Sequence, residues 1–194
     1  MGLNGFTPST AQNLQLDAGI LVKNHTVGKA IVEANKLGAT SGGSTFNATP
    51  TMRNIFDDLD GSRGNYKEGN VIDTWDITLS ATVKEITADN IKLAIAAADK
   101  TAIDGVTTHD AIVPRNEIKD TDYLDNLCWI GTKKGSGEFM VIELKNVLNS
   151  NGFSFTATDK GTGAVALELK AHFDLAKPDE VPFTIYTPKA SLPA

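Results

Sequence analysis

The sequence predicts a mainly β protein: an antiparallel β-sandwich or barrel with one short flanking α-helix and a long loop or hairpin excursion. Three observations support this fold class. Residues 74–84 alternate strictly between apolar and polar side chains, as in an antiparallel strand with one buried and one solvated face. The second half of the chain carries short β-rich segments separated by glycine-bearing turns. Only one segment, 87–99, has the features of a helix.

The chain has 194 residues, which suits one domain with a substantial core. We expect an N-terminal arm over residues 1–12, which are rich in glycine, serine and threonine. A single β domain then covers 13–187, with an excursion at 38–70, and residues 188–194 form a C-terminal tail.

The first strand is expected over residues 13–24, with Gly19 marking a bulge or a bend. The excursion at 38–70 is too long for a structureless loop in a compact domain, so it should have strands or partners of its own.

The clearest strand of the sequence lies within residues 74–86. Its inward face is predicted to hold Trp75, Ile77, Leu79, Ala81 and Val83. Its solvated face is predicted to hold Asp76, Thr78, Ser80, Thr82 and Lys84.

A helix is expected immediately after this strand. Thr87 is a suitable N-cap, and Asp89 complements the helix dipole in the first turn. Residues 90–99 supply the body of the helix. The predicted inward stripe consists of Ile91, Ala94, Ile95 and Ala98.

The remaining segments are all predicted to be strands. Residues 127–131 and 138–147 should form a hairpin across the turn at 132–137. Further strands are expected at 153–159 and at 164–175. The inward residues of the second of these are predicted to be Val165, Leu167, Leu169, Ala171 and Phe173. The last strand is expected at 181–187, where Pro182 indicates a strand start or a sheet edge.

The charge and composition argue against several classes of function. The net charge of −6 is unsuited to tight nucleic-acid binding, which needs a basic surface. The single cysteine, Cys128, excludes an internal disulfide and a cysteine cluster, and we expect it to be a small core residue. His25, His109 and His172 match no metal-binding spacing, and His172 is expected on a polar strand surface. We therefore predict no catalytic residue, no metal and no cofactor.

The polar stretch 54–70 raises the question of a calcium loop. If Gly61 is the central glycine, Phe56 takes the first ligand position and Lys67 takes the last, where carboxylates are needed. The glycine-rich segments at 38–45 and 131–137 lack the Gly-Lys-Ser/Thr ending of a phosphate loop. These segments are more simply explained as turns or contact loops.

The same stretch carries apolar side chains that lack local partners. Met52, Ile55 and Phe56 either fold back on their own barrel or dock on another subunit, and we favour docking. The other inter-subunit contact candidates are Arg53, Asp58, Asp60 and Arg63. The two arginines are the expected partners for carboxylates of a neighbouring subunit.

The beginning of the chain lacks the basic and apolar regions of a signal peptide, and its apolar runs are too short to span a membrane. We therefore expect synthesis and use in the cytosol, without a membrane partner.

The order of segments over residues 10–187 resembles the major tail proteins, or tail tube proteins, of long, flexible-tailed bacteriophages, especially those of Gram-positive hosts. The most specific part is the block 42–99, which contains GGSTFNATPTMRNI, DTWDITLSATVKEIT and NIKLAIAAAD.

The resemblance implies a hexameric ring that stacks into a hollow tube. The tube forms around a tape-measure protein, ends at tail terminator and tail-tip proteins, and carries DNA only in transit. It implies a place in the virion tail after assembly in the host cytoplasm, and contacts between rings made by the arm 1–12 and by residues 38–70. The lumen-facing candidates are Asp76, Thr78, Ser80, Thr82, Glu168 and Lys170, with His172 beyond them. The alternatives are a ring-forming secretion tube or tail terminator, and a carbohydrate- or ligand-binding β-sandwich.

Overall fold

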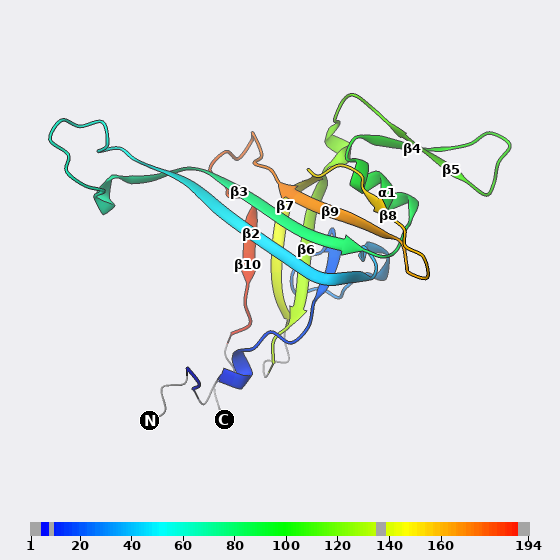
Figure 1. Ribbon diagram of the computed structural model, residues 1–194, viewed down its shortest axis with the longest axis horizontal. Coiled ribbons are helices and arrows are strands. Elements are labelled where there is room, and N and C mark those ends of the chain that lie inside the picture. The colour runs from blue at the N-terminus through cyan, green and yellow to red at the C-terminus, as the bar shows by residue number, and fades with distance from the viewer. Residues whose placement is uncertain (1–4, 8–9, 135–138, 190–194) are drawn as a thin grey trace.

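The computed structural model describes residues 5–7, 10–134 and 139–189 (Figure 1). Its main antiparallel sheet contains β1 (Ile20–Lys23), β2 (Thr40–Asn54), β3 (Asn70–Val83), β6 (Leu124–Thr132), β7 (Phe139–Asn149), β8 (Phe155–Thr156), β9 (Ala164–Ala171) and β10 (Phe183–Tyr186). A separate two-stranded sheet contains β4 (Ala98–Ala102) and β5 (Asp110–Pro114). The single α-helix is α1 (Ala88–Ile95), and the 3-10 helices are η1 (Thr10–Asn13), η2 (Glu33–Asn35), η3 (Lys67–Gly69) and η4 (Asp120–Asp122).

The eight strands of the main sheet form two layers. The strand order is β1-β6-β7-β9-β3-β2, with β10 beside β7 and β8 beside β9. β7 pairs with β9 only through its last residues, 147–149, and with β10 through 141–144. The sheet turns at this point, so that β2, β3 and β9 cross in front of β6, β7 and β10 (Figure 1).

The hydrophobic core lies between these two layers. Leu79 and Leu169 come from one layer and Leu127 and Leu144 from the other, and all four are at most 1% exposed. The opposite face of β3 and β9 carries polar side chains. The alternation of these strands therefore follows from burial on one side only. The predicted antiparallel, mainly β fold is confirmed.

The central prediction for residues 74–86 is confirmed. Ile77, Leu79, Ala81 and Val83 are buried, and Trp75 is half-buried at the edge of the core. The strand begins earlier than predicted because its first residues pair with β2 in a long hairpin.

The helix is shorter than predicted. Thr87 caps it as expected, since its hydroxyl accepts a hydrogen bond from the Asn90 backbone N–H at 3.2 Å. The chain leaves the helix at Ala96, which has a φ of 70°. Ala98 therefore belongs to β4 and not to the helix, and the β4–β5 hairpin was not predicted from the sequence.

The predicted first strand was wrong in extent, since only residues 20–23 form β1. Gly19 is the expected bend, with a φ of 69°. A Cβ atom here would lie 2.5 Å from the Trp129 indole, so the ring requires a glycine. The predicted strand at 153–159 is reduced to β8. Phe173 is exposed and not inward, because β9 ends at Ala171.

Other strand predictions agree with the structure. β6 and β7 form the predicted hairpin, although residues 135–138 of its turn lie outside the described part of the chain. Pro182 precedes β10, which pairs only with β7. At the chain ends, the described part of the arm includes η1, and Phe6 is exposed. Residues 1–4 and 8–9 of the arm and 190–194 of the tail are outside the described residues.

Candidate assembly surfaces

The six lumen-facing candidates lie together on one face of the β2–β3–β9 layer. Thr78 is opposite Lys170, and Ser80 is opposite Glu168. Directly opposed residues of an antiparallel pair point to the same side of the sheet. Register with β2 adds polar side chains that sequence reasoning did not select, namely Thr45, Asn47 and Thr49.

The charges on this polar face are few, and acidic groups outnumber basic ones. The Lys170 ammonium lies 2.5 Å from the Asp76 carboxylate, so the one cation of this set is already paired. Glu168 accepts a hydrogen bond from the Ser150 hydroxyl at 3.1 Å. The other members of the set are hydroxyl and amide side chains. This face of the sheet is therefore polar and able to form hydrogen bonds, and none of the six candidate residues is an unpaired cation.

His172 does not share the surface position expected for it. It follows the end of β9 and is half-buried, with Nδ1 3.1 Å from the Asn146 carbonyl oxygen. Its ring meets Tyr123 edge to face, at 5.3 Å between centroids. The contacts of the ring with Asn146 and Tyr123 explain why it is half-buried.

Residues 51–74 form a projecting hairpin arm. β9 pairs with β3 only over residues 78–83, so the outer part of β3 has β2 as its only strand partner. The arm extends well beyond the body of the sandwich (Figure 1). The predicted excursion at 38–70 is therefore mostly the second strand of the sheet and the tip of this arm.

Apolar side chains on the arm are uncovered. Met52 is opposite Ile72 in the hairpin, and the two are 61% and 49% exposed. Ile55, Leu59 and Tyr66 are also exposed in or near the tip. Phe56 differs because it is half-buried, with its ring 6.1 Å from that of Tyr66. Met52 and Ile55 thus remain free for a partner, whereas Phe56 belongs to the tip's own small cluster.

The tip, residues 55–69, is organised by Asn54 at the end of β2. The Asn54 amide nitrogen donates to the Tyr66 carbonyl at 2.8 Å, and its oxygen accepts from the Phe56 backbone N–H at 2.9 Å. The Ile55 N–H also bonds the Gly69 carbonyl at 2.8 Å. These bonds close the loop into a defined shape.

The charged candidates of the arm divide into two groups. Arg53 has a partner within its own chain, since its Nε lies 2.8 Å from Asp73 of the same hairpin, and the expected pairing with a neighbouring subunit stays a prediction. Asp73 is brought beside Arg53 by an irregularity of the β2–β3 register, in which residue 73 has no direct partner on β2. Asp58, Asp60 and Arg63 are exposed, and none has an ion pair within the described part of the chain.

β2 presents an open sheet edge, since β3 is its only strand partner among the described residues. Two features restrict the pairing of another strand with this edge. Gly42 and Gly43 form a bulge with positive φ angles, and Pro50 has no N–H to offer. The stretch 44–49 between them contains no charged residue. Charge, proline and bulges are the usual protection of an edge strand, so these six positions are left accessible to another strand.

The residues with possible chemistry do not form a reactive site. Cys128 is buried, and burial together with the Glu143 charge raises the pKa of its thiol to about 12. It is the small core residue that the sequence predicted. Across residues 5–7, 10–134 and 139–189, no group of three or more His, Cys, Asp or Glu side chains is arranged to hold a metal ion. Within the same ranges, no helix has the length and apolar character needed to cross a membrane.

No protein-family model matches the chain, and the comparison with curated proteins finds no match. The resemblance to tail tube proteins therefore stays a prediction.

Sequence reasoning did not select Leu59, Tyr66 or Ile72 as contact residues. Leu59 and Tyr66 lie in the polar stretch 54–70, where a large apolar side chain among polar neighbours indicates a possible contact residue. Ile72 needed the hairpin register, which places it opposite Met52.

Proposed function

We propose that this protein is a structural protein of the phage tail, which self-assembles into hexameric rings that stack into a hollow tube. The observation that carries the proposal is the combination of a one-sided polar sheet face with a projecting, apolar hairpin arm. The first suits the wall of a water-filled channel, and the second needs a partner outside its own domain.

The polar face of β2, β3 and β9 supports a conduit for DNA. A wall that carried unpaired lysine or arginine would bind phosphates and slow the passage of the nucleic acid. Lys170 is paired with Asp76, and its neighbours are mainly hydroxyl side chains. Such a wall hydrates a moving polyanion without holding it.

The arm supports an assembly that propagates along an axis. A surface that docks on a different surface of the next copy makes rings or filaments and not closed dimers. Exposed apolar groups such as Met52 and Ile72 would be covered in such an array. The open edge of β2 over 44–49 offers a second contact, in which a strand of the adjacent copy extends the sheet.

The partners of the proposed tube are further copies of the chain, a tape-measure protein inside it, and terminator and tip proteins at its ends. Its place is the virion tail, after assembly in the host cytoplasm. A secretion tube or tail terminator built on the same fold would use the same surfaces but differ in the length of the assembly. A carbohydrate-binding sandwich would depend on exposed aromatic residues such as Phe153 and Phe155, and would not polymerise.

Electron microscopy of concentrated purified protein tests the proposal directly. We expect hollow rods or stacked rings in negative stain. Dispersed single particles at every concentration and salt condition would contradict it. Rods of indefinite length favour a tube protein over a terminator, which should stop at single rings.

Deletion of residues 54–68 tests the role of the arm. We expect a folded monomer that no longer forms rods, because the removed residues make few contacts with the body. Shortening the β4–β5 loop over 104–108 controls for the loss of an exposed hairpin tip as such. Normal rods from the 54–68 deletion would reject the arm as an assembly element.

A further inference from the structure

The loop between β7 and β8 contains an Asn-Gly pair, Asn151 and Gly152. Asn151 is exposed, and among the described residues it is the only asparagine that a glycine follows. In such a pair the backbone nitrogen of the glycine can attack the side-chain amide carbon of the asparagine, because the glycine has no Cβ atom to hinder the approach. The pair is therefore a candidate for chemical modification.

The residues on either side of Asn151 are held by hydrogen bonds. The Ser150 N–H donates to the Glu168 carbonyl at 2.8 Å, and the Ser150 hydroxyl donates to the Glu168 carboxylate at 3.1 Å. The Gly152 carbonyl accepts from the Asn149 side-chain amide at 3.0 Å. These bonds fix the course of the loop and leave the Asn151 side chain exposed between them.

The two groups that would react are themselves free. Within the described part of the chain, neither the Asn151 side chain nor the Gly152 N–H takes part in a hydrogen bond. Gly152 has a φ of 69°, and a Cβ atom placed on it would meet nothing within 4 Å. An engaged N–H would have to give up its hydrogen bond before it could react. Here that barrier is missing, and the space around the glycine is open.

We propose that Asn151 is a site of spontaneous deamidation. The Gly152 nitrogen forms a bond to the side-chain carbon of Asn151. The proton of this nitrogen passes through water to the amide nitrogen of the side chain, which leaves as ammonia. Water then opens the resulting succinimide ring at one of its two carbonyl carbons. The products are aspartate and isoaspartate, and each carries a carboxylate in place of the neutral amide.

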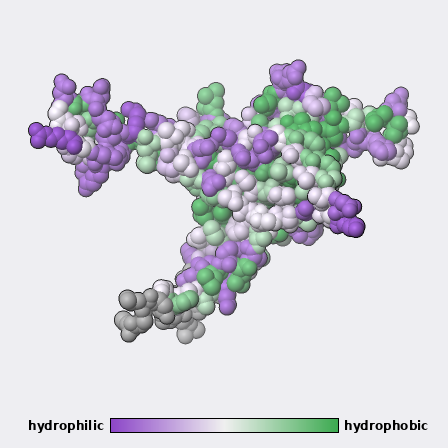
Figure 2. Space-filling view, in the orientation of Figure 1, coloured by the Kyte–Doolittle hydropathy of each residue, from purple (hydrophilic) through white to green (hydrophobic). Residues whose placement is uncertain are grey.

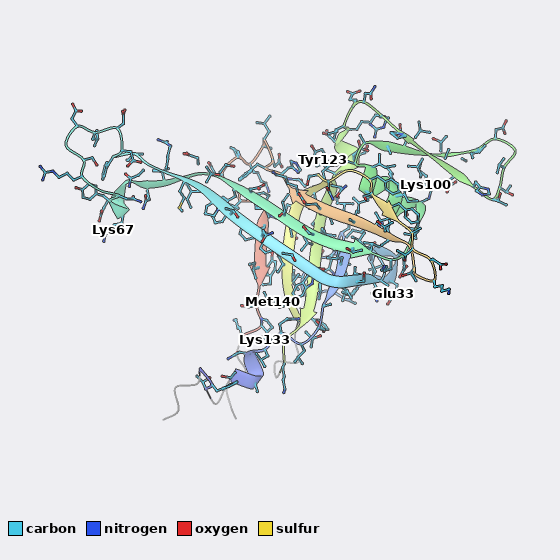
Figure 3. All side chains as sticks on the ribbon, in the orientation of Figure 1. Glu33, Lys67, Lys100, Tyr123, Lys133 and Met140 are labelled. Atoms are coloured by element: carbon cyan, nitrogen blue, oxygen red, sulfur yellow. The ribbon has the colours of Figure 1, made fainter. Side chains whose placement is uncertain are left out.

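The new carboxylate would lie at the polar face of the β2–β3–β9 layer. Asn151 lines a hollow of about 300 Å³ on this face, together with Ser80 of β3 and Glu168 of β9. Figure 2 shows pale and hydrophilic atoms along β2 and β3 on the side turned to the viewer, and Figure 3 shows side-chain oxygen atoms there. Glu168 is the only charged residue that lines the hollow. Deamidation therefore places a second negative charge beside the first, and the two repel each other.

The modification itself does not depend on the proposed tube, but its consequence does. Ser80 and Glu168 are candidates for the channel wall, so each deamidated copy would make that wall more acidic. A virion protein is not replaced after assembly. The acidic charge of the wall would then increase with the age of the particle.

Incubation of the purified full chain in warm, mildly alkaline buffer tests the site, with peptide mass spectrometry as the measurement. We expect Asn151 to deamidate at least tenfold faster than Asn149, which is the internal control two residues away. Asn149 is 4% exposed, and both its amide nitrogen and its amide oxygen are hydrogen-bonded. Asn4 also precedes a glycine but lies outside the described residues, so its peptide is measured separately.

Protein unfolded in urea in the same buffer gives the rate of the Asn151–Gly152 pair without a fold. A native rate less than a tenth of the unfolded rate would overturn the inference, because the fold would then protect the pair. The aged fraction should elute with Asn151→Asp in anion exchange. Asn151→Gln, whose longer side chain closes the ring poorly, should not develop that fraction beyond what Asn4 contributes.

Rod formation is scored separately by electron microscopy. Deamidation of Asn151 in a protein that forms no rods leaves the site standing and rejects the tube. Rods built from chains whose Asn151 stays intact throughout the incubation reject the site and leave the tube proposal standing.

Discussion

The guanidinium of Arg115 donates to both carboxylate oxygens of Asp122, with Nη2 2.6 Å from Oδ1 and 2.7 Å from Oδ2. The Asp122 side chain is completely buried and also accepts a hydrogen bond from the Lys119 backbone N–H at 2.8 Å. Arg115 follows β5, and its Nε lies 2.9 Å from the carboxylate of Asp99 in β4. This cluster fastens the β4–β5 hairpin to the segment that leads into β6.

Asp122→Asn should destabilise the protein at neutral pH by about 2 kcal/mol, the size of a hydrogen bond to a charged group. Burial alone would raise the pKa of Asp122, but the hydrogen bonds from Lys119 and Arg115 and the nearby positive charges lower it on balance. A lowered native pKa means that the carboxylate stabilises the fold above its unfolded pKa. This contribution is lost as the pH falls through the native pKa.

Urea unfolding of wild type and Asp122→Asn across pH values from about 7 to about 2 measures this effect. The stability difference between the two proteins should shrink below about pH 4 as Asp122 becomes protonated in the wild type. A difference that is constant over the whole range would show that the carboxylate charge contributes nothing.

Ala48→Pro should block assembly without unfolding the chain. Proline is tolerated in an edge strand only where its nitrogen faces the open side, and Pro50 occupies such a position in β2. Ala48 is two residues earlier, so its N–H also points to the open edge. The matched control is Asn47→Pro, which removes a bond of the β2–β3 ladder instead.

We expect Ala48→Pro to unfold near the wild-type temperature and to form no rods. Asn47→Pro should lower the unfolding temperature markedly. Size-exclusion chromatography, electron microscopy and thermal unfolding measured together distinguish the two cases. Rods from Ala48→Pro would show that the edge at 44–49 is not used.

Thr78→Lys combined with Thr82→Lys should make the polar face bind DNA. Both side chains are half-exposed on the same side of β3, so the new ammonium groups should remain solvated and the fold should tolerate them. Each phosphate contact makes DNA affinity fall with rising salt concentration. Gel-shift titrations at two salt concentrations should show salt-sensitive binding for the double variant and negligible binding for the wild type. Placing the same lysines at exposed positions of the β4–β5 loop controls for net charge.

Cys128 should resist thiol reagents in the native protein. Its side chain is buried, and burial and Glu143 raise the thiol pKa to about 12, so the reactive thiolate is scarce at pH 8. We expect labelling with a disulfide reagent only at the rate at which the chain unfolds. Addition of urea should accelerate it in step with unfolding. Rapid labelling without denaturant would contradict the buried position.

The elements that the sequence predicted well are those with one-sided burial. Residues 74–84 show this most clearly, because each inward side chain of β3 enters the same core. The candidate lumen residues were found by the same alternation. Their alignment across β9 could not be foreseen, because register depends on pairing between distant segments.

The errors arose where local signals and tertiary packing disagree. Residues 90–99 contain many alanines, which favour a helix, yet Ala98 pairs with Pro114 in a hairpin. The ion pair of Arg53 with Asp73 was not predicted, because it depends on a register irregularity that the sequence does not indicate. The exposure of Leu175 was not predicted, because it depends on the turn that the Lys177 N–H closes by donating to the Asp174 carbonyl.

β7 is the strand that connects the two layers. It bonds β10 through 141–144, and it reaches β9 only through three pairs at residues 147–149. In the described part of the chain, these pairs are the sole ladder between the front and rear halves of the domain. A load that pulls the β2–β3–β9 layer away from the β6–β7–β10 layer would therefore be opposed by these three residue pairs and by the packing of the core between the layers.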